Sequence, residues 1–503
     1  MCLFRAEKRR TSLWLFPVFF IMMLFLLTAC NDKGRQINGM EDLCGARVGV
    51  QIGTTMERVA NDYLSKNKCN LSEGYNGTPD AVTALVQGKL DVVVMDELPA
   101  FEFVKTIPQI TLIESSFDPE SYAAIVNKDK VDLLKKINTA IEEIKKEGMF
   151  DKLRNTYVLN ISDYHYEQKV KDGPVLTIAS SPDFPPYEYY ENNQIVGMEI
   201  ELARMIADKL HMRLEIESME FDSIINAVSS GKVDVGFSGF SRTEERAKVV
   251  NFTDKTFASR IYLIVPNNNA SSFSIADLKD KFYNNFIKEN RWKMLVNGLG
   301  ITLIISVFSA VIGLVGGTVM AIIRAVNYRN GSFKILNMLI KLYINLVRGT
   351  PVMVQLLIIY YVIFASVDIN KIFVAIIAFG FNSMAYTEEI IRGGIKAIPN
   401  GQYEAGYSLG FKLSTTMRYI ILPQAFKNVL PSLANEGISL IKETSICGYI
   451  GLMDLTRGGV IIRNITFEAF LPLLAVALIY FIIIGSLSFA VSILERRLKK
   501  NER

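Results

Sequence analysis

Charged and polar side chains at the ends of predicted strands and helices form the first group with possible chemistry. Arg246 lies in the first turns of a predicted helix, and its planar guanidinium can hold a carboxylate through two hydrogen bonds. Thr54 and Thr55 open another predicted helix, and the backbone N–H groups at a helix N-terminus attract anions. Asp96 follows the apolar run Leu90–Met95, and its carboxylate can hold a cation. This combination indicates binding of a small molecule that carries both charges.

Few residues suggest catalysis. The two histidines, His165 and His211, do not have the spacing of metal ligands, and neither a catalytic triad nor an HExxH motif is visible. The phosphate-binding motif GxxxxGK[ST] is also absent, so any ATP must be hydrolysed by a partner protein. We therefore expect no enzyme activity, no metal and no cofactor bound by this chain.

Hydrophobicity is distributed unevenly along the 503 residues. Residues 1–29 are basic and then apolar, residues 31–290 have the composition of a soluble protein, and residues 295–495 are dominated by long apolar runs. The net charge of +4 is small, and no basic stripe interleaved with aromatic residues indicates nucleic acid. The composition predicts a leader, a soluble region and a membrane region.

The leader has the layout of a secretory signal, with basic residues before the apolar stretch Leu13–Leu27. It ends in Leu27-Thr28-Ala29-Cys30, which resembles the lipobox of bacterial lipoproteins. This resemblance implies that Cys30 receives a lipid, and an uncleaved signal anchor is the alternative. Both interpretations place residue 31 onward outside the cytoplasm.

The soluble region alternates between predicted strands and helices, which indicates α/β sheets. Strand 47–51, helix 56–66 and the apolar run at 90–95 form one unit, and a second unit begins with strand 176–180. Cys44 and Cys69 each lie near the start of a predicted strand. A disulfide between them is possible outside the cell, and two free thiols are the alternative.

Several separated segments of this region match one family. PDFPPYEYY, VGMEIELA, MEFDSIINAVSSGKVDVGFSGF and TEERAKVVNFTD resemble the first lobe of the polar amino-acid-binding proteins of ABC importers. DLCGARVGVQIGTTMERVA and GKLDVVVMDELPAFEFV resemble the second lobe. The resemblance implies a two-lobed α/β fold, as in periplasmic binding proteins.

The lobes occur in the reverse of the family's order. Residues 31–159 resemble the second lobe and its closing helices, residues 160–173 form a linker, and residues 174–285 resemble the first lobe. We interpret this order as a circular permutation of one complete domain. Two truncated tandem domains are the alternative.

The resemblance also implies roles for the site residues. Arg246 would bind the α-carboxylate of an amino acid, and Asp96 its α-ammonium group. Phe184 and Phe221 would enclose its side chain. Ser181 stands where some relatives carry aspartate, which favours a neutral polar ligand. Further contacts to the charged groups would come from Thr54, Thr55, Gly239 and Ser241.

Residues 290–503 contain five apolar runs, each of which can provide the ~20 residues that cross a bilayer. The second run is long and contains Lys341 and Arg348, so we expect only part of it to span. Basic residues after the first, third and fifth runs predict that these ends are cytoplasmic. We therefore expect an all-α domain of five membrane helices with a cytoplasmic C-terminus. The runs lie at 299–323, 336–366, 371–391, 428–450 and 470–494.

The loop after the third run contains the segment Glu404-Ala405-Gly406-Tyr407-Ser408-Leu409-Gly410. This segment resembles the EAA loop of ABC importer permeases, with Gly406 where the family usually has alanine. The resemblance implies that Glu404, Ala405 and Gly410 dock onto a cytoplasmic ATPase. An ordinary amphipathic helix is the alternative.

Both resemblances together predict amino-acid uptake by an ABC transporter in a bacterial plasma membrane. The expected partners are a separate ATPase subunit, a second copy of the chain and the amino acid. A ligand-gated channel and a tethered amino-acid receptor are the alternatives. A channel would carry a re-entrant pore loop and no EAA segment, and a receptor would carry a cytoplasmic signalling domain.

Overall fold

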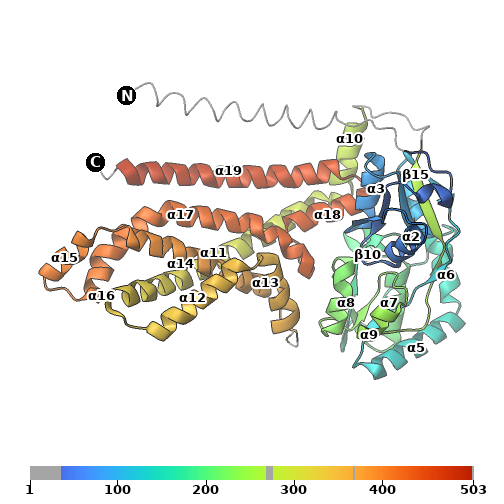
Figure 1. Ribbon diagram of the computed structural model, residues 1–503. Coiled ribbons are helices and arrows are strands. Elements are labelled where there is room, and N and C mark those ends of the chain that lie inside the picture. Colours follow the sequence, from blue (N-terminus) through green and yellow to red (C-terminus); the bar gives the residue numbers. More distant parts are fainter. Residues whose placement is uncertain (1–34, 268–275, 366, 368, 501–503) are drawn as a thin grey trace. The chain divides into compact units, whose positions relative to one another are not determined.

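The computed structural model describes residues 35–267, 276–365, 367 and 369–500 (Figure 1). The predicted lipidation site Cys30 lies outside these residues. The described chain separates into two compact units. The first contains residues 35–118 and 261–267, and the second contains residues 119–260 and 276–500.

A five-stranded sheet forms the centre of the first unit. β1 pairs in parallel with β2 and β3, and β15 pairs antiparallel with β3 and β4, which gives the order β2-β1-β3-β15-β4. The strands are β1 (Val48–Gln51), β2 (Glu73–Tyr75), β3 (Val92–Asp96), β4 (Ile110–Glu114) and β15 (Ile261–Pro266). The helices are η1 (Met40–Leu43), α2 (Thr55–Lys66), α3 (Thr78–Val86) and α4 (Glu97–Thr106).

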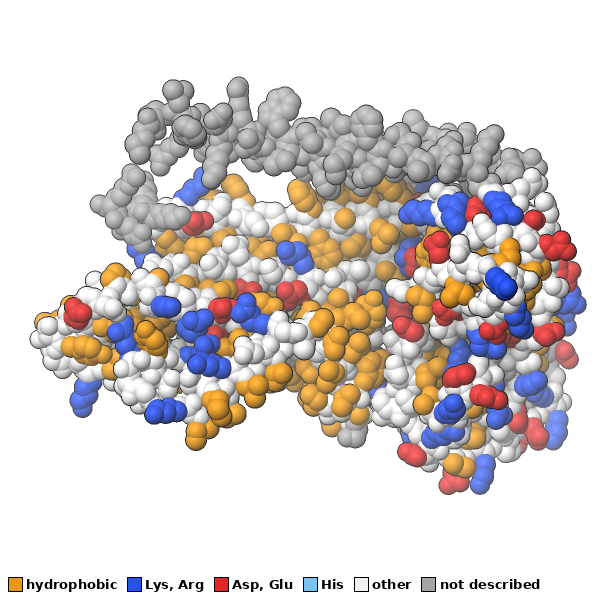
Figure 2. All heavy atoms as spheres, viewed as in Figure 1, with side chains coloured by type: hydrophobic (Ala, Val, Ile, Leu, Met, Phe, Trp, Pro, Cys, Tyr) orange, Lys and Arg blue, Asp and Glu red, His pale blue; other side chains and the backbone are white. Residues whose placement is uncertain are grey.

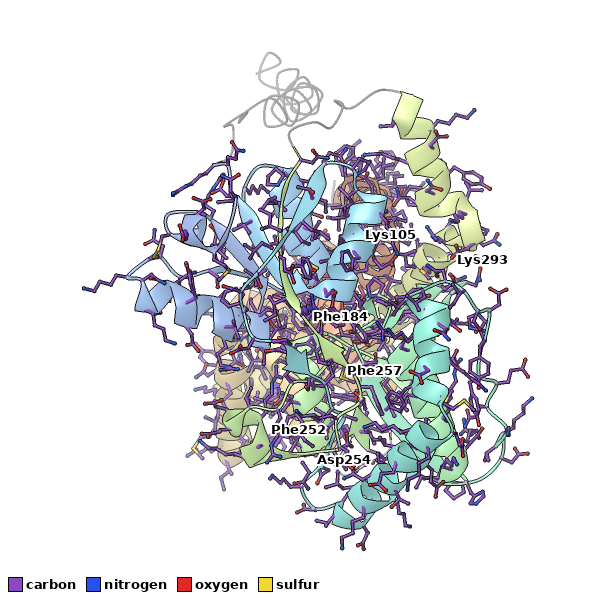
Figure 3. All side chains as sticks on the ribbon, turned by 90° about the vertical axis from the view of Figure 1, so that its right-hand side faces the viewer. Lys105, Phe184, Phe252, Asp254, Phe257 and Lys293 are labelled. Atoms are coloured by element: carbon purple, nitrogen blue, oxygen red, sulfur yellow. A yellow bond between two sulfur atoms is a disulfide. The ribbon has the colours of Figure 1, made fainter. Side chains whose placement is uncertain are left out.

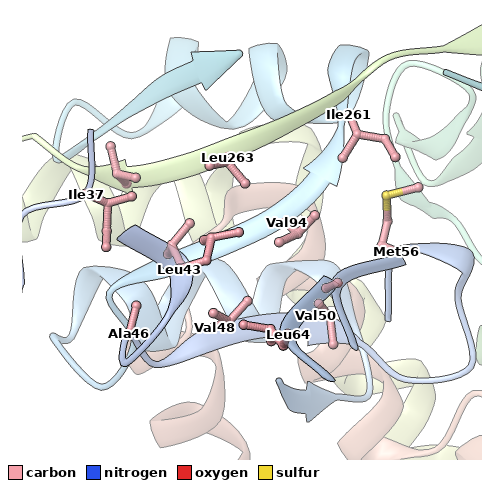
Figure 4. Close-up of a cluster of buried hydrophobic side chains, with 13 residues drawn as sticks. Ile37, Leu43, Ala46, Val48, Val50, Met56, Leu64, Val94, Ile261 and Leu263 are labelled. Carbon is pink, nitrogen blue, oxygen red and sulfur yellow. The ribbon is translucent and has the colours of Figure 1, made fainter. Parts of the chain in front are cut away.

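Buried aliphatic side chains fill the core of this unit (Figure 4). Val48 and Val50 of β1, Val94 of β3 and Leu263 of β15 are all buried there. Every residue of β3 is buried, which confirms that the apolar run at 90–95 is a strand covered on both faces.

Two links hold the beginning of the first unit. A disulfide joins Cys44 to Cys69, so the first alternative for these cysteines is correct. The buried Asp91 accepts hydrogen bonds from the Arg47 guanidinium at 2.8 and 3.1 Å and from the backbone N–H groups of Arg47 and Arg35. Burial alone would raise the pKa of Asp91, but these hydrogen bonds outweigh burial and lower the pKa.

Replacing Asp91 with asparagine should lower the free energy of unfolding by about 1–3 kcal/mol at pH 7, because the hydrogen bonds from Arg47 and Arg35 to the buried carboxylate lose their charged acceptor. The folded-state pKa is lowered, so the carboxylate stabilises the fold above its ordinary pKa of 3.8. This contribution is lost as the pH falls through the lower folded-state value. Urea unfolding of both chains between pH 7 and pH 2 would measure the difference.

Asp62→Asn is the matched control for this prediction. Asp62 is exposed and lies 3.8 Å from Arg58, a surface pair that contributes about 0–1 kcal/mol. Equal losses for Asp62→Asn and Asp91→Asn, or a loss for Asp91→Asn that is undiminished at pH 2, would contradict the prediction.

The second unit contains another five-stranded sheet, in the order β11-β7-β12-β6-β13. β7 pairs in parallel with β11 and β12, and β6 pairs antiparallel with β12 and β13. Its strands are β6 (Ile125–Asn127), β7 (Val175–Ser180), β11 (Arg213–Ser218), β12 (Val235–Gly236) and β13 (Val250–Phe252). Short pairings add β5 (Glu120–Ser121), β8 (Asp183–Phe184), β9 (Glu188–Glu191), β10 (Gln194–Val196) and β14 (Ala258–Ser259). The helices of this part are α5 (Val131–Lys146), α6 (Met149–Tyr157), α7 (Met198–Lys209), α8 (Phe221–Ser229) and α9 (Glu244–Val249).

The two sequence segments exchange one strand each. Each sheet consists mainly of strands from one segment and contains one strand from the other. β15 belongs to the segment 174–285 but pairs with β3 and β4 in the first unit. β6 belongs to the segment 31–159 but pairs with β12 and β13 in the second unit. Neither segment alone therefore supplies all the strands of either sheet.

The segment predicted as a linker is tied to α7. Asp208 accepts hydrogen bonds from the backbone N–H groups of Lys169 and Val170 and from the Tyr166 hydroxyl at 2.8–2.9 Å. Burial would raise the pKa of Asp208, but these hydrogen bonds lower it. The Tyr166 N–H also binds the buried carboxylate of Glu201. These bonds hold the middle and end of the connection against the first-lobe segment.

The rest of the second unit is helical. Its elements are α10 (Ala276–Phe282), η2 (Tyr283–Ile287), η3 (Lys288–Asn290), α11 (Trp292–Asn330), α12 (Lys334–Gly349), α13 (Val352–Ile358), η4 (Ile359–Ile363), α14 (Lys371–Lys396), α15 (Asn400–Ser408), α16 (Leu413–Thr416), η5 (Met417–Ile421), α17 (Leu422–Glu443), η6 (Thr444–Ile450), α18 (Leu455–Thr466) and α19 (Phe470–Lys500).

Two of these helices, α11 and α19, are long and apolar enough to cross a membrane alone. Two bent pairs would each qualify as one span, residues 334–363 with a bend of 108° and residues 413–466 with a bend of 51°. By length and composition the described residues thus give two spans, or up to four, where we predicted five. α14 occupies the third predicted run, but its central part contains buried polar residues, including Asn382, Ser383 and Glu388. The second run is not one continuous helix, because it breaks at Thr350-Pro351.

Small residues let α11 and α14 pack closely. A Cβ atom at Gly313 would lie 2.5 Å from the Ser383 hydroxyl, and one at Gly317 would lie 2.7 Å from Cβ of Thr387. Close packing of small residues is a common source of helix association in membranes, where the hydrophobic effect is weak. The polar side chains of α14 are thereby buried against protein.

Candidate functional site

Arg246 lies on α9 with its side chain nearly enclosed, since the residue is 9% exposed. Its guanidinium donates to the Ser241 carbonyl at 2.8 Å and lies 5.6 Å from the ring centre of Phe221. Phe221 stacks on Phe240 at 4.7 Å, and Phe240 also contacts Arg246. The hydroxyl of Thr243 caps α9 by accepting the Arg246 N–H. These contacts orient the guanidinium, which is the group that could hold a carboxylate.

Gly239 is fixed between a ring and a buried acid. Its φ of +56° lies in the left-handed region, and a Cβ atom would lie 2.9 Å from the Phe184 ring. Its N–H donates to Glu199 at 3.0 Å. Burial raises the pKa of Glu199 to about 7, although the hydrogen bond from Gly239 opposes that change.

Phe184 belongs to an aromatic group with Tyr122 and Tyr187. Its ring stacks on Tyr187 at 5.4 Å and meets Tyr122 edge-on at 6.3 Å. Tyr187 also contacts Phe257 at 5.9 Å, and Figure 3 labels Phe184 and Phe257 on the ribbon. Phe184 and Phe221 therefore belong to two separate ring groups of the second unit.

The sequence analysis missed two residues from the other segment that reach this region. Glu120 accepts the Ser241 hydroxyl at 2.5 Å, and Tyr122 forms an isolated bridge with Ser241. Both lie just before β6, the strand that the segment 31–159 supplies to this sheet. Their positions depend on that pairing, which leaves no short motif in the sequence.

In the first unit, Thr54, Thr55 and Asp96 lie at the C-terminal ends of the parallel neighbours β1 and β3. Thr54 caps α2, since its hydroxyl accepts the Glu57 N–H and donates to the Gln51 carbonyl. Thr55 and Asp96 are buried. Asp96 holds the N-cap position of α4, but its side chain forms no capping hydrogen bond. Its carboxylate therefore does not act as a helix cap.

The predicted site residues thus form two sets. The first unit holds Thr54, Thr55 and Asp96, and the second holds Phe184, Phe221, Gly239, Ser241 and Arg246. The first set lies at the C-terminal ends of β1 and β3, and the second set includes the guanidinium of Arg246 on α9.

The predicted EAA segment forms the helix α15. Tyr403 and Gly406 face the protein, whereas Glu404 and Ala405 are exposed, and Gly410 ends the segment with a φ of +78°. A Cβ atom at Gly406 would lie 2.7 Å from the Thr416 side chain. Glycine in place of the usual alanine at position 406 therefore leaves room for the Thr416 side chain against α15. Leu409 is 71% exposed, and Tyr407 and Phe411 are also exposed.

Within the second unit, the α/β part contacts the helical part through charged groups. Arg457 of α18 forms an ion pair with Glu220 and a hydrogen bond with Ser218. Lys371 of α14 lies 2.6 Å from Glu217. These contacts join the end of β11 and the residue before α8 to the first turns of α14 and α18.

Two family models match the chain. Residues 176–405 match bacterial extracellular solute-binding proteins, family 3, and residues 313–500 match the binding-protein-dependent transport system inner membrane component. The arginine transport system permease protein ArtQ of Bacillus subtilis (strain 168) is 38% identical over 210 residues, which are 41% of this chain and 94% of ArtQ. The chain belongs to the amino-acid ABC transporter permeases.

A second permease agrees with this family. The glutamine transport system permease protein GlnP of Escherichia coli (strain K12) is 39% identical over 209 residues, which are 41% of this chain and 93% of GlnP. A crystal structure of an amino acid ABC transporter with histidines is 35% identical, and the match covers 45% of this chain and all of that chain with a TM-score of 0.39. The predicted fold class, a solute-binding α/β domain with a helical permease domain, is confirmed. The predicted function, amino-acid uptake by an ABC transporter, is confirmed as well, and the comparisons give no support to a channel or a receptor.

Gly239→Ala should lower the free energy of unfolding and displace Phe184, because the new methyl group meets the Phe184 ring. We expect a loss of about 1–3 kcal/mol, as for other overpacked sites. Thermal unfolding and the near-ultraviolet circular dichroism of the full chain would report both effects.

Gly231→Ala is the control for backbone strain alone. Gly231 has a φ of +77°, and no atom lies within 4 Å of a Cβ placed there. The Gly231 variant should therefore lose stability without the aromatic change. Identical spectra for the two variants would contradict the assignment of Gly239 as a contact of Phe184.

Proposed function

We propose that this chain captures a neutral polar L-amino acid outside the cell with a circularly permuted two-lobed domain and passes it to its own permease. The exchange of β15 and β6 between the two sheets carries this proposal, because one folded domain needs both segments. Two inert tandem domains would each lack a strand. The match to solute-binding proteins begins at residue 176, at the first-lobe segment, and does not include residues 31–159.

In this proposal each charge of the ligand is bound by residues of both sequence segments. In this proposal the guanidinium of Arg246 and the N–H groups at Thr54 and Thr55 hold the α-carboxylate. The carboxylate of Asp96 and the carbonyl of Gly239 hold the α-ammonium group, and Phe184 and Phe221 enclose the side chain.

A neutral polar side chain fits the residue at position 181. The Ser181 hydroxyl donates to Asp183 at 2.9 Å and carries no charge. The relatives ArtQ and GlnP are named for arginine and for glutamine transport, respectively. Of these two amino acids, the proposal favours glutamine.

Transfer to the permease would use the contacts of Arg457 with Glu220 and of Lys371 with Glu217. Both ion pairs lie at the boundary between the α/β part and the helices, so they can hold the binding domain at the entrance of the passage. The exposed α15 would dock onto a cytoplasmic ATPase subunit, which supplies ATP hydrolysis. The proposed assembly contains two copies of this chain and two ATPase subunits, with the binding domains outside and the C-termini inside.

Arg246→Lys and Asp96→Asn should each weaken amino-acid binding by about 10–100-fold, since each removes a charge-assisted hydrogen bond worth roughly 1.5–3 kcal/mol. Calorimetric titration of the full chain with glutamine and arginine would measure both affinities. Arg242→Lys is the matched control, because Arg242 is exposed and lies four residues before Arg246. If none of the twenty amino acids binds the unmodified chain, the permuted domain is not a functional receptor.

Glu404→Lys should abolish uptake while amino-acid binding stays unchanged, because Glu404 is exposed on the proposed docking face. The measurement is uptake of labelled amino acid by vesicles that contain the chain and its ATPase subunit. Gln402→Lys places the same charge on the same helix outside the EAA segment and should reduce uptake much less. Normal uptake by Glu404→Lys would refute the docking role.

A further inference from the structure

A basic pocket lies among the ends of α11, α12, α14 and α15. Its volume is about 360 Å³, and no aspartate or glutamate lines it. Figure 2 shows Lys and Arg side chains gathered on the part of the molecule where α12 and α15 lie in Figure 1. The five cationic residues in its lining are Arg324, Arg329, Lys341, Arg392 and Lys396.

Nearby carboxylates neutralise only part of this charge. Arg324 and Arg392 share the buried Glu388, at 3.0 and 3.4 Å. Arg329 instead donates to the side-chain oxygen of Asn400 at 2.7 Å and lies 3.8 Å from the ring centre of Tyr403.

Two lysines in the lining add further positive charge. Lys341 and Lys396 are exposed, and neither forms an ion pair with a carboxylate among the residues that the structure describes. Positive charge therefore remains at the mouth of the pocket, where an anion with several acceptor oxygens would be stabilised.

An apolar surface adjoins the same pocket. α12 contributes Asn337 and Lys341 to the lining, while Ile335, Met338 and Leu342 on that helix are exposed. A phosphate headgroup with acyl chains would satisfy both surfaces, whereas a free anion would use only the pocket. Basic pockets between membrane helices on the cytoplasmic side are suited to acidic lipid headgroups.

We propose that this pocket binds the phosphate headgroup of an acidic phospholipid from the cytoplasmic leaflet. The inference rests on the proposed function in one respect, since the orientation of α15 toward the ATPase places the pocket at the cytoplasmic face. Asn400 and Tyr403 belong to α15 and line the pocket, so a bound headgroup would also fix α15 against the ends of α11 and α14.

Calorimetry of the detergent-solubilised full chain with dihexanoyl phosphatidylglycerol, below its micelle concentration, tests this proposal. Dihexanoyl phosphatidylcholine, glycerol 3-phosphate and inorganic phosphate are the comparison ligands. Phosphatidylglycerol should bind at least tenfold more tightly than each of them. Lys341→Gln and Lys396→Gln should each weaken its binding about fivefold, and the double variant roughly 25-fold.

Lys412→Gln is the matched control, because Lys412 is an exposed lysine of the same domain outside the pocket. The affinity of this variant for phosphatidylglycerol should equal that of the unmodified chain. Equal affinity for phosphatidylcholine, or an unchanged affinity in the double variant, would overturn the proposal. If inorganic phosphate binds as tightly as phosphatidylglycerol, the pocket is a site for free phosphate, and the proposal of a lipid ligand is wrong. Amino-acid binding titrated in the same samples should not change, so failure of lipid binding is distinguishable from failure of the proposed function.

Discussion

Hydrogen bonding across β15 and β6 is the constraint on which the soluble region depends. β15 pairs with two strands of the first unit over five registered positions on one side and four on the other. β6 pairs antiparallel with β12 over two registered positions and with β13 over three, both in the second unit. A buried strand left without its neighbour would expose backbone N–H and C=O groups whose desolvation is costly. Each lobe therefore depends on the segment that supplies the other lobe.

This constraint explains why a reversed order of lobes is compatible with folding. A sheet is defined by which strands are neighbours and does not depend on the order in which the chain visits them. The connection at 160–173 has only to join two ends of one lobe, and Asp208 and Glu201 hold it there through backbone and tyrosine hydrogen bonds. Glu120 and Tyr122, which belong to the segment 31–159, then contact Ser241 of the other segment.

Sequence patterns predicted the features that depend on local order. The apolar run at 90–95 is a buried strand, Asp96 ends it, and the segment at 404–410 forms an exposed helix with glycine at its end. Features set by tertiary contacts could not be predicted. The Phe240 ring beneath Arg246 and the Glu199 carboxylate beneath Gly239 come from elements whose packing leaves no short motif. Pro351 could have predicted the break between α12 and α13, but the apolar residues on both sides of it formed one run at 336–366.

In the proposed function, one permuted domain forms one amino-acid site. Equilibrium dialysis of the full chain with a saturating labelled amino acid measures the number of molecules bound. We expect one molecule per chain, because the two segments share a single site. Two molecules per chain would contradict it, since each segment would then bind alone.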